Sequence, residues 1–198
     1  MRIFLLFAAV IAVGAAVGIG LKQASDSSPS AALPGGIHPS AAAVREALAG
    51  APAPLAALHA RADELLPGAR KRLRTELAAL VGHPVVVNAW ASWCGPCNVE
   101  APILQRVALK LGRRVAFLGV DEKDSRGGAR RFAARYPLSY PSVEDGSGEI
   151  YNDLRLQGMP STIFYDARGH RTIVHTGQYE TEAALEADIQ RYAVHPAP

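Results

Sequence analysis

Two long apolar runs dominate the pattern of hydrophobic and polar positions, and each predicts a strand that is buried on both faces. The first covers residues 85–90 and the second covers residues 114–121. Near-continuous apolar runs of this length are typical of strands inside a parallel sheet. A helix is expected between them, from Gly95 to about Leu111. Together the three elements predict a β-α-β unit.

The pattern after the second run predicts a helix, a short strand, a hairpin and a final amphipathic helix. They are expected at residues 125–135, at 140–143 as an edge strand, at 161–166 and 171–176 on either side of a Gly-containing turn, and at 185–192. The order β-α-β-α-(β)-α-β-β-α predicts an α/β fold. We expect a central mixed β-sheet flanked by helices, because β-α-β crossovers need cover on both faces.

An Ala-rich stretch, residues 40–82, predicts three short helices before the first buried strand. Ser40 could cap the first helix, which ends at Gly50. Pro54 could begin the second, whose apolar face reaches Leu65. The third is indicated by leucines at helical spacing, namely Leu73, Leu77 and Leu80.

The first 22 residues predict a transmembrane signal anchor. Arg2 is followed by 19 uncharged, mostly apolar residues, 3–21, which as a helix would span roughly 28 Å, close to the hydrocarbon thickness of a bilayer. A cleaved signal peptide is the alternative, because small residues such as Ala15 and Ala16 suit a cleavage site. An anchor with its N-terminus inside leaves the rest of the chain outside the cytoplasm, on the periplasmic or cell-envelope side.

The remaining domain boundaries follow from composition. Residues 23–39 are rich in Ser, Pro, Gly and Ala and predict a flexible linker. We expect residues 40–68 to be a helical membrane-proximal segment, 69–194 to be the folded domain and 195–198 to be a tail. Hydrophobic residues make up 49% of the 198-residue chain, enough for one core. The net charge of +3 is too small to indicate a nucleic-acid partner.

The chain has two cysteines, Cys94 and Cys97, and their spacing favours redox chemistry. A structural disulfide framework spreads its cysteines along the chain. A zinc site needs about four ligands, and His59 and His83 lie at unsuitable spacings. We therefore expect no metal and no cofactor other than a redox-active disulfide.

Three acidic residues after the second buried strand, Asp121, Glu122 and Asp124, could suggest a cation site. No matching ligands recur elsewhere in the sequence, so we interpret them as part of a solvated loop.

The cysteine pair stands where a buried strand gives way to a helix. A helix N-terminus stabilises a thiolate, the nucleophile of disulfide exchange. Cys94 is expected to be the exposed attacking sulfur and Cys97 the inward resolving one. Substrate contacts are expected from the residues around the pair: Gly95 and Pro96 in the first turn, with Trp90 and Trp93 as an apolar rim.

The segment 91–97 (ASWCGPC) resembles the signature of the thioredoxin superfamily. The longer string 86–102 resembles the TlpA/ResA (DsbE-like) branch of extracytoplasmic thioredoxin-like oxidoreductases, and the likeness returns at 158–161 (GMPS). It covers about residues 69–194. The resemblance implies a thioredoxin-like fold with the central βα insertion of that branch, matched here by residues 119–125 and 140–143.

Three further site assignments follow from the resemblance. Pro160 matches the family's cis-proline, which leaves backbone groups open to an incoming peptide, with Met159 beside it. Asn88 stands where ordinary thioredoxins carry a buried Asp. Glu100 matches a helix Glu of the branch and is expected to be a partly buried proton carrier for Cys97, with a raised pKa. The alternatives are a strand-initiating proline for Pro160 and a solvent-facing charge for Glu100.

Together the residues and the resemblance predict a thiol–disulfide oxidoreductase that reduces protein disulfides outside the cytoplasm. An oxidising compartment requires a supply of electrons, and the resemblance implies a membrane thiol-shuttling protein as the donor. Cytochrome c maturation is one setting that the resemblance implies. A disulfide-forming oxidase of the same fold is an alternative, as is a membrane-tethered binding or chaperone module.

Overall fold

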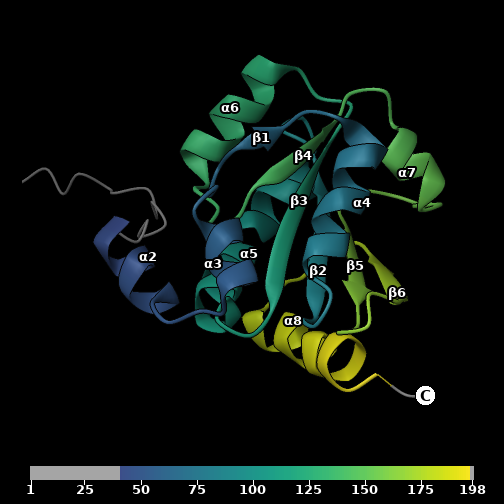
Figure 1. The fold of residues 1–198 in the computed structure, drawn as a ribbon. Helices are drawn as coiled ribbons and strands as arrows, with labels where there is room; N and C mark the ends of the chain where they lie inside the picture. Colours follow the sequence, from purple (N-terminus) through teal and green to yellow (C-terminus); the bar gives the residue numbers. More distant parts are fainter. Residues whose placement is uncertain (1–40, 197–198) are drawn as a thin grey trace, which may run out of the picture. The chain divides into compact units, whose positions relative to one another are not determined.

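The two apolar runs form adjacent parallel strands at the centre of a sheet. In the computed structural model, which describes residues 41–196, β2 spans Val85–Trp90 and β3 spans Ala116–Glu122. Every residue of both strands is buried. Helix α5 (Gly95–Leu111) connects them, so the predicted β-α-β unit is confirmed (Figure 1).

The sheet contains six strands in the order β1-β4-β3-β2-β5-β6. The parallel part is β1 (Leu65–Leu66), β4 (Ser142–Asp145), β3 and β2. On the other side of β2, β5 (Ser161–Tyr165) and β6 (Arg171–Thr176) run antiparallel as the expected hairpin. The sheet is therefore mixed, as predicted.

The strand expected at the sheet edge lies inside the sheet, because β1 pairs along its outer side. We expected Leu65 to continue a helix, and this is wrong. The helix α3 (Ala53–His59) ends earlier, and the backbone carbonyl of Glu64 accepts a hydrogen bond from the Ser142 nitrogen at 2.8 Å. That long-range bond draws the segment into the sheet.

Helices cover both faces of the sheet (Figure 1). The face that carries Val87 and Leu118 packs against α3, α4 (Ala69–Ala79) and α7 (Glu149–Asp153). The face that carries Phe117 packs against α5 and α8 (Glu182–Asp188). Helix α8 continues directly into the π-helix Ile189–Val194, and the two cover residues 185–192, where the final amphipathic helix was expected. The other helices are α2 (Ala41–Leu48) and α6 (Arg126–Arg135).

Residues 53–66 belong to the same core as the strands, whereas we expected 40–68 to form a separate segment. Leu55 and Leu58 of α3 are fully buried in the cluster that contains Val87. The expected anchor (1–22) and linker (23–39) lie outside the described residues. Within residues 41–196, no helix has the length and apolar character needed to cross a membrane.

Candidate active site

Cys94 and Cys97 form a disulfide at the N-terminus of α5. Their Cα atoms are 5.3 Å apart, and Cys94 Sγ accepts a hydrogen bond from the Cys97 backbone nitrogen at 3.3 Å. The Cys94 side chain is therefore the N-cap of the helix. A sulfur in this position lies at the positive end of the helix dipole, where a thiolate is stabilised.

Both cysteines are buried in this oxidised state. Cys94 is 4% exposed and Cys97 is 2% exposed, so Cys97 faces inward as expected but Cys94 is not the exposed sulfur we predicted. The physical reason is packing: both residues belong to a small apolar cluster with Ala91, Ala129 and Phe132.

Only one of the two expected rim tryptophans lies at the surface. Trp93 is 61% exposed, and Gly95 and Pro96 beside it are exposed too. Trp90 is buried, so its assignment to the rim is wrong. Its ring stacks on Phe132 with centroids 4.2 Å apart, which makes it part of the core under the disulfide.

Gly119 explains how the Trp90 indole fits between β3 and β4. The indole nitrogen donates to Ser142 Oγ at 3.1 Å. A Cβ at Gly119 would lie 2.7 Å from that nitrogen and 2.0 Å from Ser142 Oγ. Only glycine therefore leaves room for this contact on β3.

The Met159–Pro160 peptide bond is cis, as the resemblance implied. It immediately precedes β5, the neighbour of β2. Met159 is half-buried and packs against the cluster that contains the two cysteines. The segment thus lies beside the disulfide, where a bound peptide is expected.

Glu100 is completely buried on α5, one turn after Cys97. Its carboxylate accepts hydrogen bonds from Asn88 Nδ2 and from the Tyr179 backbone nitrogen, both at 3.3 Å. Burial raises the Glu100 pKa to about 7, although the two hydrogen bonds oppose the shift. A solvent-facing helix charge is therefore excluded, and the expected raised pKa is found.

The acidic residues after the second apolar run are not a solvated loop, as we had interpreted them. Asp121 and Glu122 belong to β3 and are 4% and 3% exposed. Burial is the largest cause that raises the pKa of Asp121 to about 7 and that of Glu122 to about 8. Asp124 is half-buried, and its carboxylate contacts Ser92 next to the active site. No motif spacing pointed to that contact. Within the described part of the chain, no group of three acidic, His or Cys side chains could hold a metal ion.

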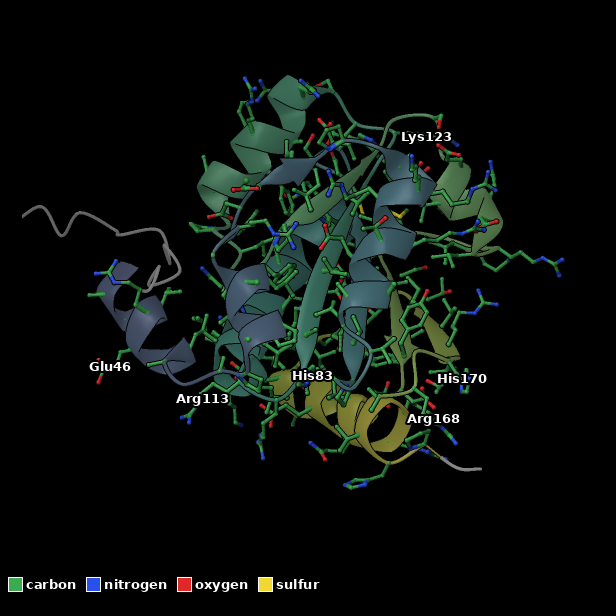
Figure 2. All side chains as sticks on the ribbon, in the orientation of Figure 1. Glu46, His83, Arg113, Lys123, Arg168 and His170 are labelled. Atoms are coloured by element: carbon green, nitrogen blue, oxygen red, sulfur yellow. A yellow bond between two sulfur atoms is a disulfide. The ribbon has the colours of Figure 1, made fainter. Side chains whose placement is uncertain are left out.

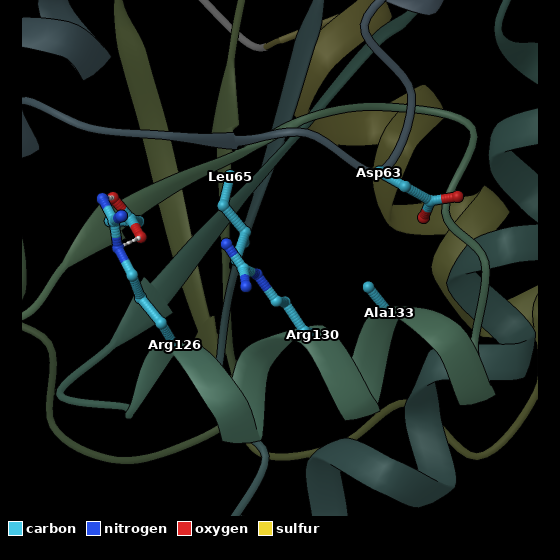
Figure 3. A pocket seen from close by; sticks show the side chains of 6 residues that line it. Asp63, Leu65, Arg126, Arg130 and Ala133 are labelled. Carbon is cyan, nitrogen blue, oxygen red and sulfur yellow. Dashed lines mark hydrogen bonds and ion pairs between the residues drawn. The ribbon is translucent and has the colours of Figure 1, made fainter.

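A cavity of about 340 Å³ lies between α6 and β1, and neither cysteine lines it (Figure 3). Arg126 on its wall is paired with Glu144, while Arg130 points toward the cavity. The redox pair thus lies outside this cavity.

A family comparison assigns residues 48–189 to the Redoxin family. The chain belongs to this family. A thiol:disulfide interchange protein DsbE from Tatumella citrea is 32% identical over 154 residues, which are 77% of this chain and 75% of that protein.

Other relatives align over a shorter stretch. The soluble secreted antigen MPT53 of Mycobacterium tuberculosis is 34% identical over 50% of this chain and 56% of that protein. DsbE of Pseudomonas fluorescens biotype C is 37% identical over 46% and 51% respectively. The chain thus spans about half the length of these curated relatives.

Solved structures confirm the thioredoxin-like fold of this Redoxin-family chain. A putative DsbE from Chlorobium tepidum superposes with a TM-score of 0.54 at 28% identity, over 57% of this chain and 82% of that chain. A DsbF homologue from Corynebacterium diphtheriae gives 0.53 at 30% identity, over 58% and 74%.

Proposed function

We propose that this protein is a thiol–disulfide oxidoreductase that reduces protein disulfides outside the cytoplasm. The observation that carries the proposal is the Cys94–Cys97 disulfide at the start of α5, with Cys94 Sγ held by the Cys97 N–H. Relatives named as thiol:disulfide interchange proteins support it. The chemistry needs no cofactor beyond the two cysteines.

The reaction proceeds in two exchanges. In the reduced enzyme the Cys94 thiolate attacks one sulfur of a target disulfide, which forms a mixed disulfide and releases the other target sulfur as a thiolate. Cys97 then attacks Cys94 Sγ. The target leaves with both its sulfurs reduced, and the enzyme keeps the Cys94–Cys97 disulfide. Two electrons pass from the enzyme to the target.

Glu100 accepts the Cys97 proton in the second exchange. A thiol must lose its proton before it attacks, and Glu100 lies one helical turn from Cys97 with a pKa of about 7. A base with a pKa near the working pH is efficient in both directions. When the pair is reduced again, Glu100 returns the proton.

The target binds around the disulfide. Trp93, Gly95 and Pro96 form the exposed apolar side of this surface. Met159 packs beside the disulfide, and the backbone of Met159 and Pro160 before β5 is the proposed site for an extended peptide. Shape and main-chain contacts of this kind suit many targets because they ignore most side chains.

The partners follow from the compartment. A reductase in an oxidising space must itself be reduced again, and we propose a membrane thiol-shuttling protein as the donor and the chain's N-terminal segment as its membrane anchor. Cytochrome c maturation is a setting in which the target would be an apocytochrome disulfide.

Insulin reduction in the presence of dithiothreitol tests the activity. We expect the wild type to accelerate the reduction of insulin by dithiothreitol. Cys94→Ser should abolish this acceleration with the fold intact. Cys97→Ser should accumulate a mixed disulfide through Cys94, because the resolving sulfur is missing. A wild-type protein that leaves insulin disulfides intact would contradict the proposal.

The equilibrium potential of the pair separates the reductase from a disulfide-forming oxidase. A value near or below about −270 mV marks a reductant, and one near about −120 mV marks an oxidant. A binding or chaperone module would instead keep its function in Cys94→Ser.

A further inference from the structure

The loop that presents the disulfide is held from outside by the segment that follows β3. This active-site loop comprises residues 91–93, between β2 and Cys94. The Asp124 carboxylate accepts hydrogen bonds from the Ser92 backbone nitrogen at 2.6 Å and from Ser92 Oγ at 2.9 Å. The Lys123 carbonyl accepts one from the Trp93 indole nitrogen at 3.2 Å. Lys123 lies at the end of the sheet where β3 ends (Figure 2).

Helix α6 fixes the Asp124 carboxylate in place. The Ser125 backbone nitrogen donates to Asp124 Oδ1 at 2.7 Å, and Ser125 Oγ caps α6 by accepting from the Gly128 nitrogen at 3.0 Å. Arg126 of the same turn pairs with Glu144 of β4 at 2.9 Å (Figure 3). The carboxylate that holds the active-site loop is thus attached to a helix that is itself tied to the sheet.

Gly128 is the residue that allows this close approach. A Cβ at position 128 would lie 2.4 Å from Ser92 Oγ and 2.5 Å from Asp124 Oδ1. Both distances are shorter than any ordinary contact, so a side chain there would push Ser92 and Asp124 apart.

We propose that Asp124 is a positioning residue for Cys94, acting through Ser92. Ser92 lies two residues before Cys94, so the contact with Asp124 helps to fix the backbone that places Cys94 at the N-cap of α5. The proposal rests on the proposed function only in that Cys94 is the attacking sulfur. If the active-site loop is released, the reduced Cys94 Sγ loses its alignment with the Cys97 N–H and with it part of the stabilisation of its thiolate.

The test compares Asp124→Ala, Asp124→Asn and a matched control, Asp166→Ala. Asp166 holds the β5–β6 turn in the same way, accepting from the Arg168 and His170 nitrogens at 2.9 Å each. The rate at which iodoacetamide alkylates Cys94 in the reduced full-length protein is measured across pH. The equilibrium of the pair with glutathione is measured as well.

We expect Asp124→Ala to slow alkylation at neutral pH by about tenfold, since small losses of alignment are costly, and to raise the Cys94 pKa. Asp124→Asn, which keeps an acceptor for Ser92, should stay within about threefold of wild type. Asp166→Ala should lose stability without changing either readout. Equal slowing in the Asp166 variant would reduce the role of Asp124 to folding and overturn the proposal.

A direct effect of the Asp124 charge on Cys94 would shift the Cys94 pKa in the opposite direction. Removing a nearby carboxylate favours the thiolate, so a lower Cys94 pKa in both Asp124 variants would overturn positioning as the cause. Gly128→Ala reaches the same contact with the carboxylate retained. We expect it to slow alkylation as Asp124→Ala does, and a wild-type rate there overturns the proposal even if Asp124→Ala does not fold. Alkylation needs no protein substrate, so these results stand apart from insulin reduction.

Discussion

The side-chain nitrogen of Asn88 lies 3.3 Å from Glu100 Oε2 and also 3.3 Å from Thr162 Oγ1. One amide therefore joins β2, α5 and β5 around a carboxyl group that has no exposed surface. Two donated hydrogen bonds do not replace the water that an ionised carboxylate loses on burial. The carboxyl of Glu100 can therefore gain and lose its proton near neutral pH, one helical turn from Cys97.

Glu100→Gln is expected to lower the pKa of the Cys97 thiol. The amide keeps the shape of the side chain but never ionises, so no negative charge one turn away opposes the thiolate. Ultraviolet titration of the reduced protein measures both thiols, and Cys94→Ser and Cys97→Ser assign them. If neither thiol pKa differs from wild type, Glu100 does not act on the pair.

Glu100 should also make stability depend on pH. Its folded pKa of about 7 lies above the ordinary value of 4.5, so its contribution is complete below 4.5 and is lost as the pH rises through 7. We expect the oxidised wild type to lose roughly 3 kcal/mol relative to Glu100→Gln over this window. Urea unfolding at several pH values measures it. Glu180→Gln, at an exposed carboxyl, should show no such difference.

A buried pair of carboxyl groups, Glu122 and Asp145, should also lower the stability of the protein in alkaline solution. Glu122 and Asp145 are register partners on β3 and β4, and Asp145 Oδ2 accepts from the Ile150 and Tyr151 nitrogens. Burial and the Asp145 carboxylate raise the Glu122 pKa to about 8, so stability falls as the pH rises toward and through that value.

In Glu122→Gln the side chain no longer titrates, and its amide is expected to donate to Asp145 at every pH. We expect the variant to unfold at a higher urea concentration than wild type above pH 8 and to differ little at pH 4.5. A midpoint difference that is the same at both pH values would show that ionisation of Glu122 does not cause the loss of stability.

The two tryptophans near the disulfide should behave in opposite ways. Trp90→Ala removes a buried ring that stacks on Phe132 and is expected to cost about 3–5 kcal/mol of stability. Trp93→Ala should leave stability within about 0.5 kcal/mol of wild type but raise the KM for a protein disulfide. Thermal unfolding and insulin-reduction kinetics on both variants separate the roles, and an unchanged KM in Trp93→Ala would remove Trp93 from the docking surface.

The helix α3 should contribute to the stability of the whole domain. Leu58→Ala opens a cavity in the cluster that contains Val87, which is expected to cost about 2–5 kcal/mol. Val81→Ala is the control, because Val81 is 58% exposed. A Leu58 variant as stable as wild type in urea would mean that this helix is a separate segment after all.

Elements whose local pattern agrees with their environment were predictable from the sequence. β2 and α5 have the bounds that the apolar run and the cysteine motif indicated, because a strand buried on both faces needs no polar alternation. Trp90 was also accessible to this reasoning. It lies two residues after Asn88, and alternate residues of a strand share a face, so both side chains lie on the same face of β2.

Other features depend on long-range contacts that no local pattern contains. β1 is only two residues long and is fixed by its pairing with β4. Asp121 and Glu122 have the composition of a loop, yet strand pairing with β4 buries them. The contact between Ser92 and Asp124 joins residues 32 positions apart, and only the fold brings them together.

The short length of β1 has a consequence for how the protein behaves among its neighbours. A free strand edge is a template on which another chain can add, and natural sheets limit this with short edge strands. β1 covers β4 along Ser142 and Val143 and offers an incoming strand only two residues of its own. At this edge of the sheet, the brevity of β1 therefore disfavours the addition of a strand from another chain.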